Sequence, residues 1–114
     1  MEIDNISRIR DGLREGIYSN NPALCATDRA ILSGEFAWIC GQLEIILSRK
    51  PVIWNNMRSN PAIKSDTACE RKYQQTEDGV NEMGLKLRLK SCEKMMNGLS
   101  GLLKIAEGQK NNQW

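Results

Sequence analysis

The sequence contains no histidine, the side chain that most often serves as a general base and as a ligand for transition metals. Its four cysteines, Cys25, Cys40, Cys69 and Cys92, form no C-x-x-C pair, so neither a zinc knuckle nor a thioredoxin-type motif is present. We therefore predict reduced, buried cysteines in an intracellular protein with no metal and no cofactor. No serine or cysteine has an evident base beside it, and no Gly-rich phosphate loop is found, so we expect no enzymatic activity.

Residues that favour β-sheets are also scarce. Valine occurs twice and proline three times, and aromatic residues make up 5% of the 114 residues. Leucine, isoleucine, lysine, glutamate and arginine are plentiful, which favours helices. We predict an all-α fold, either an elongated helical hairpin or a small helical bundle, with a long coiled-coil-like C-terminal helix. One helical domain is expected over residues 1–107, with a polar tail over 108–114.

Apolar spacing predicts a first helix over residues 4–18 and a second over 28–58. Asp4 is the expected N-cap of the first helix, and Thr27 or Asp28 that of the second. The second helix has a main apolar row with heptad-like spacing: Leu32, Phe36, Ile39, Leu43, Ile46, Ile53 and Met57. A flanking row repeats every seven residues: Ile31, Trp38, Ile45 and Val52. Pro51 predicts a kink or short break near that position.

A third helix is predicted over residues 65–107, with Ser65 as its N-cap. It has two apolar seams. The first is Cys69, Tyr73, Thr76, Val80, Met83 and Leu87, and the second is Leu85, Leu89, Cys92, Met96, Leu99 and Leu103. Unbroken, this helix would be about 65 Å long, too long for its own chain to cover. Either it bends back at Gly79 or Gly84, or another copy covers it, and we expect a homo-oligomer.

Several residues are candidates for a partner or oligomer interface, because aromatic and seam residues dominate buried contacts. They are Trp38, Trp54, Leu85, Leu89, Met96, Leu99, Leu103 and Trp114. Trp114 ends a polar stretch that we interpret as a frayed tail, with anchoring to a partner as the alternative.

Two groups of charged residues are candidate sites. The carboxylates of residues 66–82 (Asp66, Glu70, Glu77, Asp78 and Glu82) could serve a metal-dependent nuclease, but Arg71 and Lys72 stand among them and a solvated helix face explains them better. Lys86, Lys90 and Lys94 are spaced four apart beside Arg88, and these four are the candidate contacts to phosphate or nucleic acid. A net charge of +2 and the lack of interleaved aromatics argue for a solvated face here too.

The N-terminal stretch MEIDNISRIR has no apolar core and does not resemble a signal peptide. The most apolar run, FAWICGQLEIIL, is interrupted by Gln42 and Glu44 and is too short to cross a bilayer. We expect a cytoplasmic protein that makes no membrane contact.

The C-terminal half contains a series of short motifs: a K-S-D start, an arginine, a T-E-x-G step, an L-K-x-x-E-K run, and an asparagine near a final aromatic. These are Lys64, Ser65 and Asp66, then Arg71, then Thr76, Glu77 and Gly79, then Leu89, Lys90, Glu93 and Lys94, then Asn112 and Trp114. In these motifs the chain resembles small helical proteins of tailed phages and prophages. The stretch KPVIWNNMR, residues 50–58, fits the same type. Many such proteins are encoded near recombination or single-strand-binding genes, which implies a role in phage DNA metabolism or in blocking a host system, in the cytoplasm of a bacterial host cell. The resemblance assigns no catalytic residue.

Two functions therefore compete. The first is a non-catalytic protein that binds and modulates or inhibits a host or phage complex such as a nuclease, recombinase or defence system. The second is an accessory of DNA recombination or replication, touching nucleic acid through the lysine stripe as part of an oligomer. A carrier of a small anionic nucleotide at an oligomer interface is a further alternative.

Overall fold

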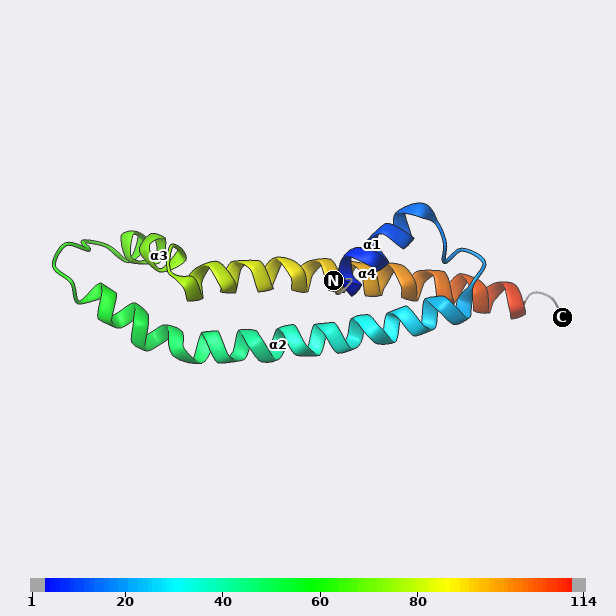
Figure 1. Cartoon of the computed structure of the whole chain (residues 1–114), viewed down its shortest axis with the longest axis horizontal. Helices are drawn as coiled ribbons and strands as arrows, with labels where there is room; N and C mark the ends of the chain where they lie inside the picture. Colours follow the sequence, from blue (N-terminus) through cyan, green and yellow to red (C-terminus); the bar gives the residue numbers. More distant parts are fainter. Residues whose placement is uncertain (1–3, 112–114) are drawn as a thin grey trace. The chain divides into compact units, whose positions relative to one another are not determined.

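The computed structural model describes residues 4–111, which form four α-helices and no strand (Figure 1). In chain order they are α1 (Asn5–Glu15), α2 (Pro22–Arg58), α3 (Asp66–Gln74) and α4 (Glu77–Asn111). The prediction of an all-α fold is confirmed. Where the sequence predicts a polar tail from residue 108, α4 continues to Asn111.

The chain forms two compact units, where the sequence predicts one domain. Unit 1 comprises the described residues of Met1–Trp38 and Lys90–Trp114, and unit 2 comprises Ile39–Leu89. The first part of α2 and the last part of α4 therefore belong to unit 1 with α1. The rest of α2, all of α3 and the start of α4 belong to unit 2.

Helix α1 begins where the sequence predicts it and ends three residues early. The side chain of Asp4 accepts a hydrogen bond from the backbone N–H of Ile6 at 3.1 Å, which confirms it as the N-cap. Gly16 then adopts φ of 75°, a left-handed conformation that glycine takes without steric cost. Its N–H donates to the carbonyls of Gly12 and Leu13 in the last turn of the helix. The helix ends there, so Ile17 and Tyr18 lie beyond it.

Helix α2 begins six residues before the predicted start. Asn21 accepts a hydrogen bond from the N–H of Leu24 at 3.1 Å, and Pro22 occupies the first helical position, where its missing N–H costs nothing. Thr27 and Asp28 are therefore interior residues, and the prediction that either one caps the helix is wrong. The helix also continues through Pro51 to Arg58.

The predicted third helix is two helices, α3 and α4, separated at Gln75 and Thr76. Ser65 caps α3 as predicted, accepting from the N–H of Ala68 at 3.1 Å. Thr76 begins the new helix, because its hydroxyl accepts from the N–H of Gly79 at 3.0 Å and donates to the carbonyl of Tyr73 at 2.6 Å. A Cβ on Gly79 would collide with the backbone of Tyr73 and Gln74. The expectation of an unbroken helix over residues 65–107, or of a bend at Gly79 or Gly84, is replaced by this capped break.

The core of unit 1 lies between α1, α2 and α4. Two buried thiols link α2 and α4: Cys25 donates to the carbonyl of Leu99, and Cys92 to the carbonyl of Leu32, both at 3.2 Å. Residue numbers rise along α2 as they fall along α4, so the two helices are antiparallel here. Ile9 of α1 is fully buried against them.

The core of unit 2 is built from Ile39, Leu43 and Ile46 of α2, Ile63 of the connection, and Cys69 and Tyr73 of α3. The buried thiol of Cys69 donates to the carbonyl of Trp54 at 3.5 Å. Burial is thus confirmed for three of the four cysteines. Cys40 is exposed instead, because its neighbour Ile39 occupies the inner row of α2 and the next residue along a helix points about 100° away.

Within the described residues, α2 is the one helix long and apolar enough, by length and composition, to cross a membrane. The core helix of a soluble protein passes the same test. The expectation of no membrane contact rests on the run FAWICGQLEIIL alone, which is too short to cross a bilayer. The helix that contains this run, α2, is 37 residues long.

Candidate interaction surfaces on α2 and α4

A buried polar cluster in unit 1 joins α1 to α2. The carboxylate of Asp28 accepts two hydrogen bonds from the guanidinium of Arg8, both at 3.0 Å, and one from the hydroxyl of Tyr18 at 2.7 Å. The hydrogen bond from Arg8 holds the pKa of Asp28 below its usual range despite burial. Burial and the hydrogen bond to Asp28 raise the pKa of Tyr18 to about 12. Three hydrogen bonds from its own chain hold the buried carboxylate, so we interpret the cluster as structural.

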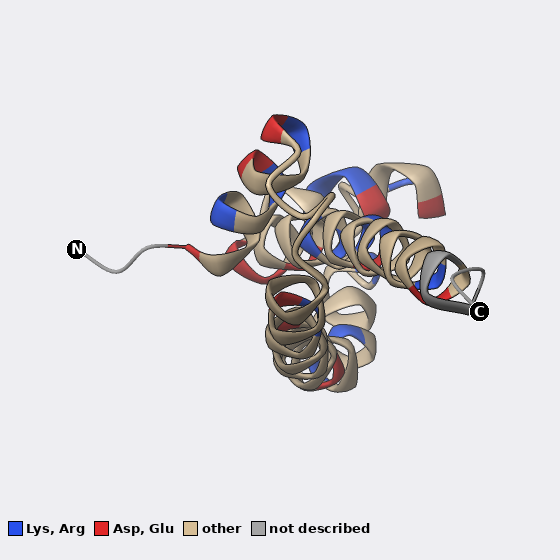
Figure 2. Cartoon of the chain, turned by 90° about the vertical axis from the view of Figure 1, so that its right-hand side faces the viewer, with Lys and Arg blue, Asp and Glu red and all other residues tan. Residues whose placement is uncertain are grey.

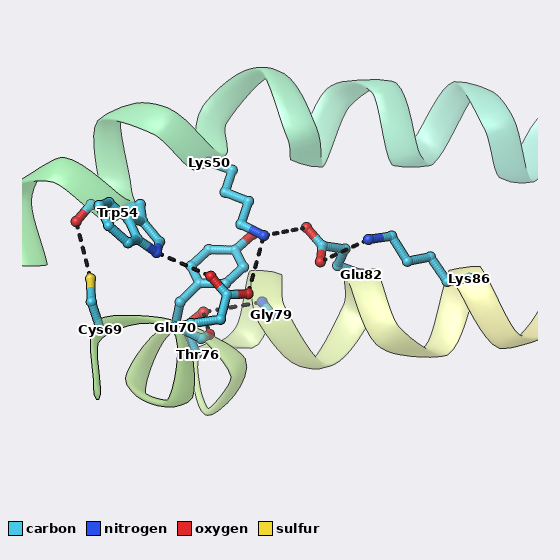
Figure 3. Close-up of polar contacts among 9 residues, drawn as sticks. Lys50, Trp54, Cys69, Glu70, Thr76, Gly79, Glu82 and Lys86 are labelled. Carbon is cyan, nitrogen blue, oxygen red and sulfur yellow. Dashed lines mark hydrogen bonds and ion pairs between the residues drawn. The ribbon is translucent and has the colours of Figure 1, made fainter. Parts of the chain in front are cut away.

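A second polar cluster lies in unit 2, between α2, α3 and the start of α4 (Figure 3). The ammonium of Lys50 is 3.3 Å from a carboxylate oxygen of Glu70 and 3.5 Å from one of Glu82. The indole N–H of Trp54 donates to the other oxygen of Glu70 at 3.1 Å, and Lys86 donates to the other oxygen of Glu82 at 3.3 Å. Lys50 therefore joins two carboxylates from two different helices.

The electrostatics of this cluster favour a charged lysine. Burial lowers the pKa of Lys50, but the hydrogen bond to Glu70 and the charge of Glu82 outweigh it, and the net shift is upward. The same ammonium lies 4.7 Å from the centre of the Tyr73 ring, within the range of a cation–π interaction. Burial, followed by the charge of Glu82, raises the pKa of the Tyr73 hydroxyl.

Two atoms of the cluster lack a hydrogen-bond partner: the hydroxyl of Tyr73 and oxygen Oε1 of Glu82, both buried. Oε1 of Glu82 nevertheless has Lys50 as its ion-pair partner. Among the described residues no three His, Cys, Asp or Glu side chains gather in a way that could hold a metal ion. The cluster offers neither a free base nor a metal cage.

The solvated-face interpretation of the 66–82 carboxylates agrees with the exposure of Asp66 and Glu77 and is wrong for Glu82. The expected Glu82–Lys86 pair forms, but Glu82 is itself buried and faces Lys50. Asp78 pairs with Arg49 of α2 at 3.0 Å, and Asp66 with Arg58 at 2.8 Å. These carboxylates hold α3 and α4 to α2 through cross-helix ion pairs, which spacing within one helix does not reveal.

The sequence did contain a signal for both clusters. Asp28 and Lys50 fall on the inner, otherwise apolar row of α2, four residues before Leu32 and four after Ile46. A charged residue in such a row requires a buried partner. The position of Asp28 and Lys50 in this row predicts that each has a buried partner. It does not predict that the partners are Arg8, Glu70 and Glu82.

Most of the predicted interface residues pack inside their own chain. Leu99 is fully buried and Trp54 is half-buried against Glu70. The other four candidates on the second seam are half-buried: Leu85, Leu89, Met96 and Leu103. Trp114 lies outside the described residues. Trp38 is different, because 56% of its surface is exposed.

Trp38 belongs to a row along α2 that we call the outer stripe. Ile31, Trp38, Ile45 and Val52 recur every seven residues, and Gly34, Gly41 and Ser48 lie between them. Ile31 and Gly41 are half-buried, and the other five are exposed. Ile45 is 50% exposed and Val52 65%. The stripe lies roughly opposite the buried row, so the apolar character that makes α2 resemble a membrane span comes from two faces.

A second exposed row, the α4 row, consists of Val80, Met83 and Leu87, with exposed fractions of 58%, 51% and 61%. Spacing of three and four places them on one face of α4. The sequence assigns all three to its first seam. That seam is buried only at Cys69 and Tyr73, because the break at Thr76 changes the direction of the chain and α4 packs through its second seam instead.

The four candidate phosphate contacts, Lys86, Arg88, Lys90 and Lys94, are all exposed on α4. Lys86 is neutralised in part by Glu82 at 3.3 Å. Figure 2 shows both signs of charge on the same helices. The lysine stripe is accessible, but its first member already has an anionic partner.

No family model, no curated protein and no solved structure matches this chain. The exposed rows and the lysine stripe are therefore interpreted from their own chemistry.

Proposed function

We propose that the protein is a non-catalytic helical protein that binds another protein, a host or phage complex such as a nuclease, recombinase or defence system, and modulates or inhibits it. The α4 row carries this proposal. Three large apolar side chains on one helix face, each more than half exposed, form the kind of contiguous patch that marks a protein-binding surface. The resemblance to phage helical proteins supports the choice of partner and a place in the bacterial cytoplasm.

The test measures binding of the purified protein to purified nuclease, recombinase and defence complexes by calorimetry. We expect a complex that persists at about 1 M salt, where charge interactions are screened within about 3 Å. Leu87→Asp should weaken it at least about tenfold, which corresponds to about 1.4 kcal/mol. Leu47→Asp is the matched control, because Leu47 is an apolar residue 42% exposed on a different helix, α2. Absence of any complex, or equal binding by both variants, would contradict the proposal.

A second candidate is an accessory role in DNA recombination or replication, supported by the exposure of all four basic residues on α4. Binding to single-stranded DNA should then weaken steeply as salt rises, because cation release drives it. Lys90→Glu with Lys94→Glu should abolish binding, and Lys104→Glu, also exposed on α4, is the control. Unchanged binding in the double variant would eliminate this candidate.

A further inference from the structure

The outer stripe has a feature that the α4 row lacks: large and small residues alternate along it. Its large members are Ile31, Trp38, Ile45 and Val52, and its small members are Gly34, Gly41 and Ser48. Steps of three and four residues keep all seven on one face of a single continuous helix. A Cβ placed on Gly34 or Gly41 would meet no atom within 4 Å, so the space above both glycines is open.

We propose that the outer stripe packs against the outer stripe of a second copy of this chain, with the two α2 helices antiparallel about a two-fold axis at the level of Leu43. Residues pair in this arrangement when they lie equally far from Leu43 in opposite directions. Trp38 then faces Ser48 of the second copy, Ile45 faces Gly41, and Val52 faces Gly34. Three of the four large side chains meet a small one, and Ile31 lies at the end of the contact, opposite Asn55. Over these three pairs the helices can approach to about 8 Å, the close end of the usual range.

A parallel pair does not have this complementarity. Each residue would then face its own copy, with Trp38 against Trp38 and Gly41 against Gly41. The tryptophans would hold the helices apart while the glycines left voids, and voids forfeit the dispersion contacts that stabilise an interface. The alternation of sizes therefore selects the antiparallel orientation.

The one hydroxyl in the stripe is already satisfied. Ser48 donates a hydrogen bond to the carbonyl of Ile45 in its own helix at 2.7 Å. Covering it with Trp38 of the second copy therefore leaves the Ser48 hydroxyl paired, whereas burying an unpaired hydroxyl would cost about 1–3 kcal/mol.

The charges beside the stripe support the same pairing. Glu35 and Arg49 flank the outer stripe on one side and are two heptads apart, so they occupy equivalent heptad positions. In antiparallel helical pairs, equivalent flanking positions of the two helices lie next to each other. Glu35 of each copy then lies two residues along the axis, about 3 Å, from the level of Arg49 of the other, twice per dimer. The Arg49 side chain is 54% exposed, so it can reach a second carboxylate while bound to Asp78. On the other flank the two Glu44 residues lie two residues, about 3 Å, apart along the axis and form an unfavourable charge pair.

This dimer is independent of the α4 row, so the proposed function and the dimer fail separately. The first experiment is sedimentation equilibrium of the full chain. We expect a dimer, a loss of association of at least tenfold in Ile45→Glu, and no change in Leu47→Glu, which lies on the same helix away from the stripe. Glu35→Arg and Arg49→Glu should each weaken the dimer, and the two together should restore it. Glu44→Gln should tighten it, and circular dichroism checks that each variant stays helical.

The second experiment determines orientation. Spin labels at Asn56→Cys, in a Cys40→Ser background, measure the distance between the two copies. In the antiparallel pair the labelled positions lie about 40 Å apart along the axis, at about 1.5 Å per residue, whereas a parallel pair brings them side by side. A monomer at high concentration, a parallel dimer, or a dimer that Leu47→Glu also disrupts would overturn the proposal. So would a monomer that binds phospholipid vesicles through the stripe.

Discussion

Arg8 and Asp28 join α1 to α2 through two parallel hydrogen bonds of 3.0 Å, in a setting where Asp28 is 2% exposed. This bidentate geometry is the strongest form of the arginine–carboxylate pair. Because α1 is only 11 residues long, it depends on such contacts to stay folded.

Asp28→Asn should destabilise unit 1 by about 3–5 kcal/mol, since it leaves the Arg8 guanidinium half-buried without its anion. Chemical denaturation followed by circular dichroism measures the loss. Asp11→Asn is the control, because Asp11 forms exposed pairs with Arg10 and Arg14 that contribute little. Equal stability of both variants would show that the buried pair is dispensable.

Acid should act through the same carboxylate. The folded state lowers the pKa of Asp28, mainly through Arg8, so the associated stability is complete above the unfolded value of about 3.9 and is lost as pH falls below it. The free energy of unfolding of the wild type should therefore fall more steeply below about pH 4 than that of Asp28→Asn. Parallel curves for the two proteins would refute this assignment.

The break between α3 and α4 predicts opposite effects for two glycines. Gly79→Ala should destabilise the protein by about 1–3 kcal/mol, because its Cβ would press on the backbone of Tyr73. Gly84→Ala should stabilise it by about 0.5–1 kcal/mol, since Gly84 lies within α4 with open space around it. Thermal unfolding compares the pair, and a stable Gly79→Ala protein would mean that α3 and α4 join differently.

The Lys50 cluster predicts non-additive behaviour. Lys50→Met leaves Glu82 buried with only Lys86 beside it and should cost about 3–5 kcal/mol. Adding Glu82→Leu should recover most of this loss, because a well-packed apolar pair often replaces a buried ion pair without cost. A double-mutant cycle of unfolding free energies measures the coupling, and simple additivity would contradict the contact.

The cysteines should differ in reactivity. Cys40 is exposed, whereas Cys25, Cys69 and Cys92 are buried, and burial also raises the pKa of the Cys25 thiol. A thiol reagent should therefore modify one cysteine quickly in the folded protein and all four in denaturant. Mass spectrometry of the peptides identifies the site, and rapid labelling of Cys92 would place the α2–α4 contact in doubt.

The helices and their buried rows were largely predictable, because apolar spacing reports which helix face avoids water. The second seam of the long segment and the inner row of α2 both pack as their periodicity indicates. The break at Thr76 was not predictable from that spacing, since Thr76 and Val80 continue the apolar pattern across it. A threonine followed three residues later by Gly79 was the available signal, and it is a capping signal rather than an apolar one.

The partners of the buried charged residues also could not be predicted from the sequence. Asp28 and Lys50 interrupt an apolar row, which indicates that each has a buried polar partner. Those partners, Arg8 and Glu82, are 20 and 32 positions away in the sequence. Spacing within one helix predicts neighbours three and four residues apart, such as Glu82 and Lys86. Contacts between helices require knowledge of their packing.

The division of the chain also determines an order of formation during synthesis. Unit 2 is one uninterrupted segment, Ile39–Leu89, whereas unit 1 combines the first 38 residues with those from Lys90 onward. On the ribosome, unit 2 can therefore assemble as soon as it has emerged. The apolar faces of α1 and of the first part of α2 stay uncovered until the last part of α4 has also emerged from the ribosome. The early segment is the one that a nascent-chain chaperone would have to protect.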